Sequence, residues 1–478
     1  MVLMESGVRR KRTVVNSMVK NGVKCPMKNK DPLLPGMQSI VDSKPKPKKE
    51  KTQKGDLYLW GVGDALPLLD DHSLTKHRIL REYLERYVAI LTKNRGIPQL
   101  NLSLVDGFAG GGAYMHHKTK ERMPGSPVLM LEAMAAAEVK AKSLRKKEFG
   151  LNATYYFVEE QKRNLEFLKS EVRASPAATG KEDCIHFING TFSKQLPTII
   201  QKIKAKGRSH KAIFLLDQYG YTHVTMANIR HIFRELPRAE VILTIAVNWL
   251  IDFVNETDKF KAALRHLELE SQQDELVSLR TEHCRDWRAL IQQRLHKHFF
   301  QKSGAACYTP FFVHSVKSHR GYWLLHFSMH STARDAMTNL HWTKENHFEH
   351  FGGPGLGMFG GTLGFDPRSE RGEAQSSFLF DKSAKEQTRD SLLIQIPERL
   401  SGFDDLVSFG HFFDQNVNDS PATKEMIAEV ISQLASDKEI EIFTKDKVER
   451  RGGVKLSEHD LIRTSSIKSF LPTRMLGE

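Results

Sequence analysis

The residues of this sequence that could do chemistry come directly after apolar runs. The first group is Asp106, Phe108, Gly110 and Gly112, which follows the run 102–105. Glycines let a backbone approach a ligand that a β-carbon would block, and open α/β sheets bind ligands at the carboxyl ends of their strands. A Gly-rich turn alone is as often a tight loop. Its position after a predicted strand is what indicates a nucleotide-type crevice.

Two further polar pairs would lie along the same edge. Glu159 follows the run 155–158, where a carboxylate can accept hydrogen bonds from both hydroxyls of a ribose. An acid favoured at a helix start explains it equally well. Asn189 and Gly190 follow the weak strand 186–188, where an adenine would be contacted, but an ordinary Asn-Gly turn is at least as good an explanation.

The strong apolar run 212–216 ends in Asp217, Gln218 and Tyr219. The carboxylate of Asp217 could accept a hydrogen bond from an exocyclic amine, and Tyr219 could stack on a base. These three are the candidate catalytic residues, against the simpler interpretation that Asp217 caps the next turn. Ser126 precedes a long predicted helix, and it is either a pocket residue or only an N-cap.

No metal site is predicted. The four cysteines, Cys25, Cys184, Cys284 and Cys307, lack metal-ligand spacing, and the histidines between 314 and 350 lack a partner carboxylate or cysteine at a diagnostic spacing. Such cysteine usage fits a reducing cytoplasm. No apolar run approaches the roughly 20 residues of a membrane helix, and the N-terminus lacks the apolar core of a secretory signal. We therefore expect a cytoplasmic protein.

The elements that would position these residues alternate along the chain. Strand-like runs separated by helical segments predict βαβ units and a mostly parallel α/β sheet. Runs at 308–316 and 322–329 predict a terminal antiparallel hairpin. This is the strand plan of a Rossmann-like Class I methyltransferase, which uses S-adenosylmethionine (SAM). The predicted parallel strands are 102–105, 155–158, 186–188, 212–216 and 241–247, preceded by a helix that follows Thr75 and ends near 94–96.

Composition divides the chain further. Residues 1–54 hold 14 lysines and arginines against 4 aspartates and glutamates, so +10 of the total charge of +14 lies there. We interpret 1–56 as a basic, mostly disordered tail, whose charge would attract nucleic acid or an anionic surface. A methyltransferase-like domain is predicted over 57–350, with a helical insertion at about 250–306. A Gly-rich, irregular linker would follow over 351–415, and a winged-helix-like domain over 416–478.

In this order the motifs resemble those of the three-Cys-motif partner protein (TcmP) family, and also those of the RlmJ type of ribosomal RNA adenine methyltransferase. The resemblance runs from about Trp60 to about His341, and the C-terminal unit is similar to the winged helix that often follows in the partner-protein family. The matching pieces are Lys76-His77, Asp106-Gly107-Phe108-Ala109-Gly110-Gly111-Gly112, Gly125-Ser126-Pro127, Phe157-Val158-Glu159, Asn189-Gly190 and Leu216-Asp217-Gln218-Tyr219-Gly220.

The resemblance implies a SAM-binding fold, with Asp217 where the RlmJ type keeps its catalytic aspartate. The residues implied to surround the cofactor are Asp106, Gly110 and Gly112 under its methionine part, Glu159 at the ribose, Asn189 and Gly190 at the adenine, and His77, Phe108 and Ser126 along the pocket. In the partner-protein family, a companion protein carries the three-Cys motif.

Two residues depart from the family patterns. Gln218 replaces the proline that follows the aspartate, and proline helps to hold a carbonyl toward the target amine because it fixes φ and removes a donor. Phe108 stands where the RlmJ type has a histidine. The sequence therefore supports SAM binding more firmly than it supports methyl transfer.

Two functions follow from these patterns. One is a SAM-dependent methyltransferase that acts on an exocyclic amine of a nucleic-acid base, in RNA or DNA. The other is a non-catalytic or non-methylating nucleic-acid-binding partner that retains the SAM-binding fold and works with a three-Cys-motif, radical-SAM-like protein. A small-molecule methyltransferase is a weaker third possibility, because it would leave the winged helix without a role.

Overall fold

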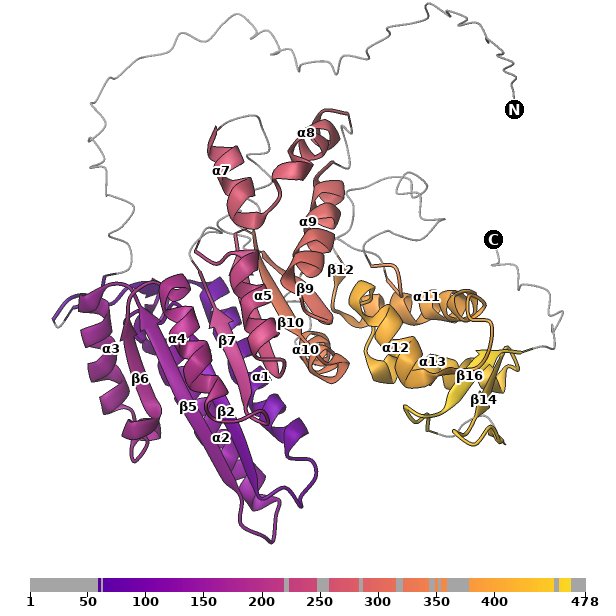
Figure 1. Ribbon diagram of the computed structural model, residues 1–478, viewed down its shortest axis with the longest axis horizontal. Coiled ribbons are helices and arrows are strands. Elements are labelled where there is room, and N and C mark those ends of the chain that lie inside the picture. The colour runs from indigo at the N-terminus through magenta and orange to yellow at the C-terminus, as the bar shows by residue number, and fades with distance from the viewer. Residues whose placement is uncertain are drawn as a thin grey trace, which may run out of the picture. The chain divides into compact units, whose positions relative to one another are not determined.

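A computed structural model describes residues 59–61, 63–218, 223–246, 258–282, 287–314, 321–343, 349–350, 354–358, 378–450 and 455–465. Its main feature is a seven-stranded sheet (Figure 1). In order across the sheet, the strands are β6 (Ile185–Asn189), β5 (Gly150–Glu159), β2 (Gln99–Asp106), β7 (Lys211–Leu216), β8 (Ala239–Ile245), β10 (Gly321–Ser328) and β9 (Cys307–His314).

The strand order identifies the fold class. The first five strands are parallel, and β10 pairs antiparallel with both β8 and β9. Numbered as they occur along the chain, the seven strands lie in the order 3-2-1-4-5-7-6, which is that of Class I methyltransferases. The predicted α/β fold with a terminal hairpin is therefore confirmed. The topology reverses between β2 and β7, and ligands of such sheets bind at that switch point.

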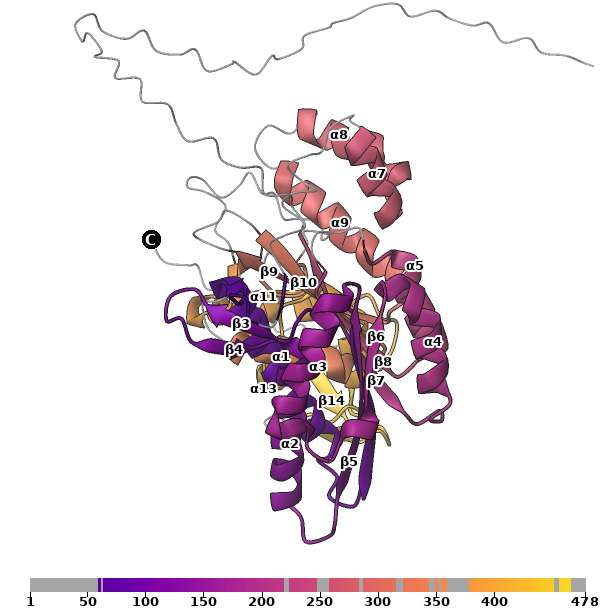
Figure 2. The same ribbon diagram turned by 90° about the vertical axis from the view of Figure 1, so that its left-hand side faces the viewer.

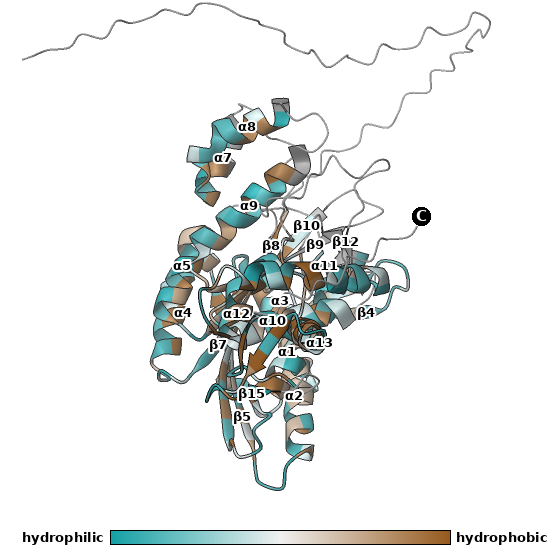
Figure 3. Ribbon diagram, turned by 90° about the vertical axis from the view of Figure 1, so that its right-hand side faces the viewer, coloured by the Kyte–Doolittle hydropathy of each residue, from teal (hydrophilic) through white to brown (hydrophobic). Residues whose placement is uncertain are grey.

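Alternating side chains divide the core into two layers. Leu102 and Leu104 of β2 face one layer and Val105 faces the other, because successive residues of a strand point to opposite faces. Figure 2 views the sheet between its helices, and in Figure 3 the hydrophobic colour gathers on the central strands. One layer contains α1 (Asp71–Leu91), α2 (Ser126–Ser143), α3 (Lys162–Ala174) and α10 (Ser331–Thr343); the other contains α4 (Phe192–Lys204), α5 (Met226–Glu235) and α9 (Trp287–Ser303).

A small second sheet lies next to the Gly-rich loop, and no sequence pattern predicted it. It has the order β1 (Leu68–Leu69), β3 (Ala113–His116) and β4 (Arg122–Pro124). Helix α1 follows β1 directly, and Asp70 caps it by accepting a hydrogen bond from Ser73 N at 2.9 Å. The helix therefore begins four residues before Thr75.

The segment expected to form a helical insertion contains α7 (Asp258–Leu267), α8 (Gln273–Glu282) and α9. It leaves the sheet beyond the carboxyl end of β8 (Figure 1). Arg230 of α5 holds it by donating to both carboxylate oxygens of Glu268, at 2.9 and 2.7 Å. His298 of α9 contacts Leu267 O at 2.7 Å.

The C-terminal part has its own hydrophobic core. Its elements are α11 (Lys382–Leu400), β13 (Val407–Ser408), α12 (Phe409–Asn416), α13 (Lys424–Ser436), β14 (Ile440–Phe443), β15 (Glu449–Arg450) and β16 (Leu461–Thr464), with sheet order β13-β16-β14-β15. The expected irregular linker over 351–415 is wrong over its second half. Leu392, Ile396 and Leu400 of α11 lie in the same core as α12 and α13, so these helices belong to one domain.

Short elements complete the described chain. They are η1 (Pro176–Ala178), η2 (Glu182–Cys184), η3 (Glu270–Gln272), η4 (Val417–Asp419), and the two-stranded ladder of β11 (Glu349–His350) and β12 (Phe378–Leu379). Among the helices that the structure describes, none combines the length and the apolar character needed to cross a membrane.

Candidate functional site

The predicted site residues lie where the parallel strands end. Asp106 is the last residue of β2, Glu159 of β5 and Asn189 of β6, and Asp217 follows β7. Because these four strands are neighbours, their carboxyl ends form one edge of the sheet. Burial is the main cause of a raised pKa at Asp106, and the carboxylates of Asp217 and Glu159 along this edge raise it further.

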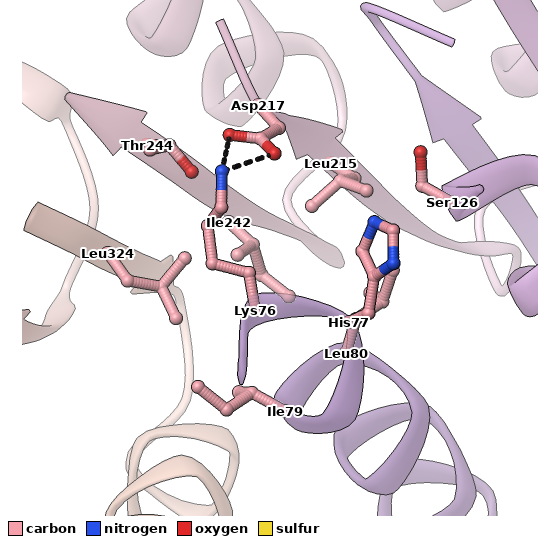
Figure 4. A pocket seen from close by; sticks show the side chains of 10 residues that line it. All are labelled: Lys76, His77, Ile79, Leu80, Ser126, Leu215, Asp217, Ile242, Thr244 and Leu324. Atoms are coloured by element: carbon pink, nitrogen blue, oxygen red, sulfur yellow. Dashed lines mark hydrogen bonds and ion pairs between the residues drawn. The ribbon is translucent and has the colours of Figure 1, made fainter. Parts of the chain in front are cut away.

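A small cavity opens between this edge and the beginning of α1 (Figure 4). Lys76 and His77 enter it from α1, Ser126 from the first turn of α2, and Asp217 from the end of β7. The rest of its wall is mostly apolar: Ile79, Leu80, Leu215, Ile242, Thr244 and Leu324. The cavity therefore brings together one cation, one carboxylate, one imidazole and two hydroxyls.

An ion pair between Lys76 and Asp217 dominates the cavity. Lys76 Nζ donates to both Oδ1 and Oδ2 of Asp217, at 2.7 Å each (Figure 4). Both side chains are largely screened from solvent, with exposed fractions of 15% and 29%. Burial would raise the pKa of Asp217, but the Lys76 ammonium outweighs it and lowers that pKa below its ordinary value. Asp217 is thus a permanent anion at neutral pH.

His77 is neutral over the physiological range. Burial and the neighbouring Lys76 ammonium lower the pKa of His77 to about 4, against a smaller opposing effect of Asp217. Its ring lies 6.2 Å from the ring of Tyr114, in an edge-to-face arrangement. A neutral imidazole in this position can donate or accept one hydrogen bond without adding charge.

Asp106 is fully buried beneath the Gly-rich loop. Burial raises the pKa of Asp106 to about 7, even though the neighbouring Ser126 hydroxyl and the Phe108 N–H lower it. The Phe108 N–H donates to Asp106 Oδ1 at 3.0 Å. Ser126 is the first residue of α2, whose N-cap is Gly125. The N-cap interpretation of Ser126 is therefore wrong.

Glu159 connects β5 to the Gly-rich loop. It accepts hydrogen bonds from Gly110 N at 3.0 Å, from Gln161 N at 2.9 Å and from Asn164 Nδ2 at 3.3 Å. Burial raises the pKa of Glu159, and these hydrogen bonds oppose the rise. In this structure the carboxylate holds the backbone of the loop in place.

Asn189 and Gly190 form the turn after β6. The Asn189 amide donates to Glu159 O at 3.0 Å and to Glu160 O at 2.9 Å, and Gly190 N donates to Glu159 O at 3.0 Å. The Asn189 side chain therefore ties β6 to β5. Gly190 has a φ of 138°, which favours glycine there.

Trp60 packs against the Gly-rich loop, a contact that the sequence patterns did not predict. Its indole Nε1 donates to Ala113 O at 2.6 Å, and its backbone N donates to Asn164 Oδ1 at 3.1 Å. A β-carbon on Gly110 would lie 3.0 Å from the indole, and one on Gly111 would overlap it. The Trp60 indole therefore packs against the glycines of the loop. The only sequence signal is that Trp60 stands where order was expected to begin.

The remaining predicted residues serve other contacts. The Phe108 ring lies 6.1 Å from Phe192 and 6.0 Å from His223. Gln218 is buried, and its Oε1 accepts hydrogen bonds from His223 N and Val224 N at 3.0 Å each. Its side chain thus connects the end of β7 to the backbone at His223 and Val224. Tyr219 lies outside the residues that the structure describes.

One group outside the cavity has the composition of a metal site: Asp71, His116 and His117. Two of its ligand groups already have partners. Lys118 Nζ lies 3.2 and 3.1 Å from the Asp71 carboxylate oxygens, and His116 Nδ1 accepts hydrogen bonds from two backbone N–H groups. We therefore assign no metal to it.

Comparison with known proteins identifies one domain. Residues 364–447 match the family model of the GMT-like wHTH domain. None of the curated proteins matches the chain in sequence. This part of the chain, which includes α11, α12 and α13, is thus a winged helix-turn-helix.

Solved structures similar to this chain include several methyltransferases. Protein LPL1258 from Legionella pneumophila is 12% identical, with a TM-score of 0.32, over 55% of this chain and 90% of its own. The O-methyltransferase from Bacillus cereus with SAH is 10% identical, with a TM-score of 0.25, over 54% and 92%. Trm1 from Pyrococcus horikoshii with SAM is 11% identical, with a TM-score of 0.25, over 81% and 91%. The fold assignment itself rests on the strand order: the chain has a Class I methyltransferase sheet followed by a GMT-like wHTH domain.

Proposed function

We propose that this chain is a SAM-dependent methyltransferase whose target is an exocyclic amine of a nucleic-acid base. The observation that carries the proposal is the ionised Asp217 at the switch-point edge, held by Lys76 in a cavity with His77 and Ser126. A fixed carboxylate at this edge suits an amine substrate, because it can accept the N–H of the incoming nitrogen.

The edge also fits the cofactor. Asp106, Glu159 and Asp217 bring three carboxyl groups to one edge, and the sulfonium and ammonium groups of SAM are cations. Glu159 would hold the ribose, Asn189 and Gly190 would flank the adenine, and Asp106 with Gly110 and Gly112 would lie under the methionine part. His77, Phe108 and Ser126 would line the pocket. SAM bound there would supply an electrophilic methyl group.

The chain's own residues would then act by positioning. Asp217 orients the target nitrogen by accepting a hydrogen bond from its N–H. Lys76 keeps the carboxylate ionised and fixed in one rotamer. Such alignment of reacting groups accounts for much of the rate in reactions of this kind. His77 remains neutral and so adds no positive charge near the methyl group. Gln218 and Tyr219, the other two residues of the proposed catalytic set, follow Asp217 directly in the sequence.

Transfer of a labelled methyl group from SAM to total RNA or total DNA tests the proposal. Wild type should label one of the two pools, and Asp217→Asn should lose most of the label while retaining SAM affinity by calorimetry. Glu159→Gln should lose SAM affinity itself. Equal labelling by wild type and Asp217→Asn would refute the catalytic role.

A second function is favoured by the same ion pair. Lys76 already donates hydrogen bonds to both carboxylate oxygens of Asp217, and the Gln218 side chain is bonded to the backbone N of His223 and Val224. A nucleic-acid-binding partner of a three-Cys-motif protein that retains the fold without methylating would have such a site. SAM binding without any methyl transfer to RNA or DNA would support this alternative.

A further inference from the structure

The winged-helix domain is bonded to the sheet domain through its helix-turn-helix turn. Arg334 of α10 is 1% exposed, and it donates from Nη1 to Ala422 O at 2.8 Å and from Nη2 to Ser420 O. Asp335 Oδ1 accepts a hydrogen bond at 2.7 Å from the backbone N of Lys424, the first residue of α13. The beginning of α13 is therefore held against α10.

Two more contacts cover the same turn. Trp342 Nε1 donates to Pro421 O at 2.8 Å, and Ser420 Oγ donates to Gly355 O at 2.7 Å. Ser420 and Ala422 are fully buried. The backbone groups of the turn are therefore bonded to α10 and to the segment 354–358.

These contacts involve the part of a helix-turn-helix domain that usually binds nucleic acid. In helix-turn-helix proteins, the N-terminal residues of the second helix enter the major groove. Here α12 and α13 are the two helices; the turn before α13 is buried, and the backbone N of Lys424, the first residue of α13, is bonded to Asp335. The exposed face of α13 carries Glu425 and Glu429, one turn apart, and carboxylates repel a phosphate backbone.

The net charge of the winged-helix domain also disfavours contact with nucleic acid. Residues 378–465 contain 12 lysines and arginines against 17 aspartates and glutamates, a net charge of −5. Residues 55–377 contain 43 against 35, a net charge of +8. A nucleic-acid interface is recognised by clustered positive charge, so the winged-helix domain is the less suitable of the two.

We infer that this winged-helix domain is a protein-docking module: the turn before α13 fastens it to α10, and nucleic acid is contacted by the sheet domain instead. Exposed cations of the insertion, Lys261 and Arg265 on α7, are one candidate contact. The docking part of the inference does not depend on methyl transfer.

Hydrogen–deuterium exchange of the full chain tests the docking. Amides of residues 422–426 should be protected in wild type and should lose protection in Arg334→Gln, while α11 keeps its protection. Asp335→Ala, which removes one of the hydrogen bonds to the winged-helix domain and leaves those of Arg334, should give a smaller loss at the same amides. Unchanged protection in both variants would overturn the docking.

Binding of fluorescent single-stranded RNA and DNA 20-mers tests where nucleic acid lies. The double variant Lys445→Glu/Lys447→Glu on the wing side should change Kd less than about twofold. The matched double variant Lys261→Glu/Arg265→Glu should weaken binding, and the slope of log K against log salt should fall by about 1 for each phosphate that the protein no longer neutralises. Weaker binding by the wing variant, or new exchange protection over α13 on adding RNA or DNA, would overturn the inference.

Discussion

The Trp60 indole fills the space that a β-carbon on Gly111 would need. The two residues are far apart in sequence, yet the ring is fixed there by its hydrogen bond to Ala113 O. The glycine at position 111 is therefore required by a side chain of the protein.

Gly111→Ala should consequently lower both stability and SAM affinity. Overpacking of this kind costs about 1–3 kcal/mol in the free energy of unfolding, and Trp60→Ala should cost about 3–5 kcal/mol because it leaves a cavity. Since the two residues touch, the double variant should lose less than the sum of the single losses. Urea denaturation and calorimetric SAM titration measure both quantities.

Gly150→Ala is the matched control for this cycle. A β-carbon at Gly150 meets its nearest neighbour, Asn152, at 3.8 Å, an ordinary contact. The control should keep the stability and SAM affinity of wild type. Additive losses in the Trp60/Gly111 cycle would show that the indole does not set the shape of the loop.

Lys76→Met should move the acidic limb of the pH–activity profile to higher pH. In wild type, the ammonium lowers the pKa of Asp217 against the effect of burial. Without it, burial is opposed only by the weaker effects of Thr244 and His77 and should raise that pKa, so Asp217 takes up a proton at a higher pH. The stability contribution of Asp217 should also change sign: in wild type it is lost as the pH falls through the lowered pKa, whereas in the variant stability should fall as the pH rises through the raised pKa. Initial rates of labelled methyl transfer from pH 4 to 9 measure the shift.

Lys118→Met provides the control for Lys76. Lys118 forms an ion pair with Asp71 on the surface, and exposed pairs contribute only about 0–1 kcal/mol. Its pH profile should match that of wild type. A pH–activity profile of Lys76→Met identical to that of wild type would show that the Lys76–Asp217 ion pair plays no part in the reaction.

Asp106→Asn should become more stable relative to wild type as the pH rises. Burial raises the pKa of Asp106 to about 7, so the folded protein keeps a proton that the unfolded chain releases near pH 4. Wild type therefore loses stability between about pH 4 and 7, by up to about 4 kcal/mol at 1.36 kcal/mol per pKa unit. Asparagine does not titrate and should avoid this loss. Urea denaturation at pH 4 to 8 should show that the difference in the free energy of unfolding between Asp106→Asn and wild type grows up to pH 7 and is constant above it. The substitution of an exposed aspartate, Asp405→Asn, should show no such difference.

Gln218→Pro should impair this protein, even though it introduces the residue found there in the families that the motifs resemble. Gln218 Oε1 accepts hydrogen bonds from His223 N and Val224 N, and proline has no group to replace it. Leaving one buried N–H group unpaired costs about 1–3 kcal/mol, and Val224 is fully buried. Gln218→Glu should lose less stability than the proline variant, because a carboxylate oxygen can still accept both bonds. A proline variant as stable as wild type in urea would contradict this role of Gln218.

Most of the central sheet could be predicted because its strands are short apolar runs between polar turns. Run 212–216 became β7 with one residue added. The weak signal at 186–188 has a structural cause, because β6 is an edge strand and only Ile185 in it is buried. An edge strand needs fewer apolar residues, so its pattern is faint.

Helix α11 could not be recognised for a similar reason. Its buried residues recur once every four positions: Ala384, Thr388, Leu392, Ile396 and Leu400. A stripe so narrow, with one polar member, resembles an irregular segment. The strands β1, β3 and β4 are too short to give any periodicity.

The candidate site was predictable only in part. Motif order placed Asp106, Glu159 and Asp217 at one edge, since strand ends in parallel sheets coincide. The use of each side chain depends on partners far along the chain: Lys76 is 141 residues from Asp217, and Trp60 is 104 residues from Asn164. Local sequence carries no signature of such contacts.

Strand β9 forms one margin of the central sheet, and Asn418 from the C-terminal domain covers its beginning. Tyr308 N donates to Asn418 Oδ1 at 2.9 Å, and Asn418 Nδ2 donates to Ala306 O at 3.1 Å, across separations of 110 and 112 residues. Uncovered margins of sheets invite pairing with other chains. During synthesis, β9 leaves the ribosome well before the residues that cover it. Until Asn418 is synthesised, Tyr308 N and Ala306 O lack these partners, and the beginning of β9 is open to pairing with another chain.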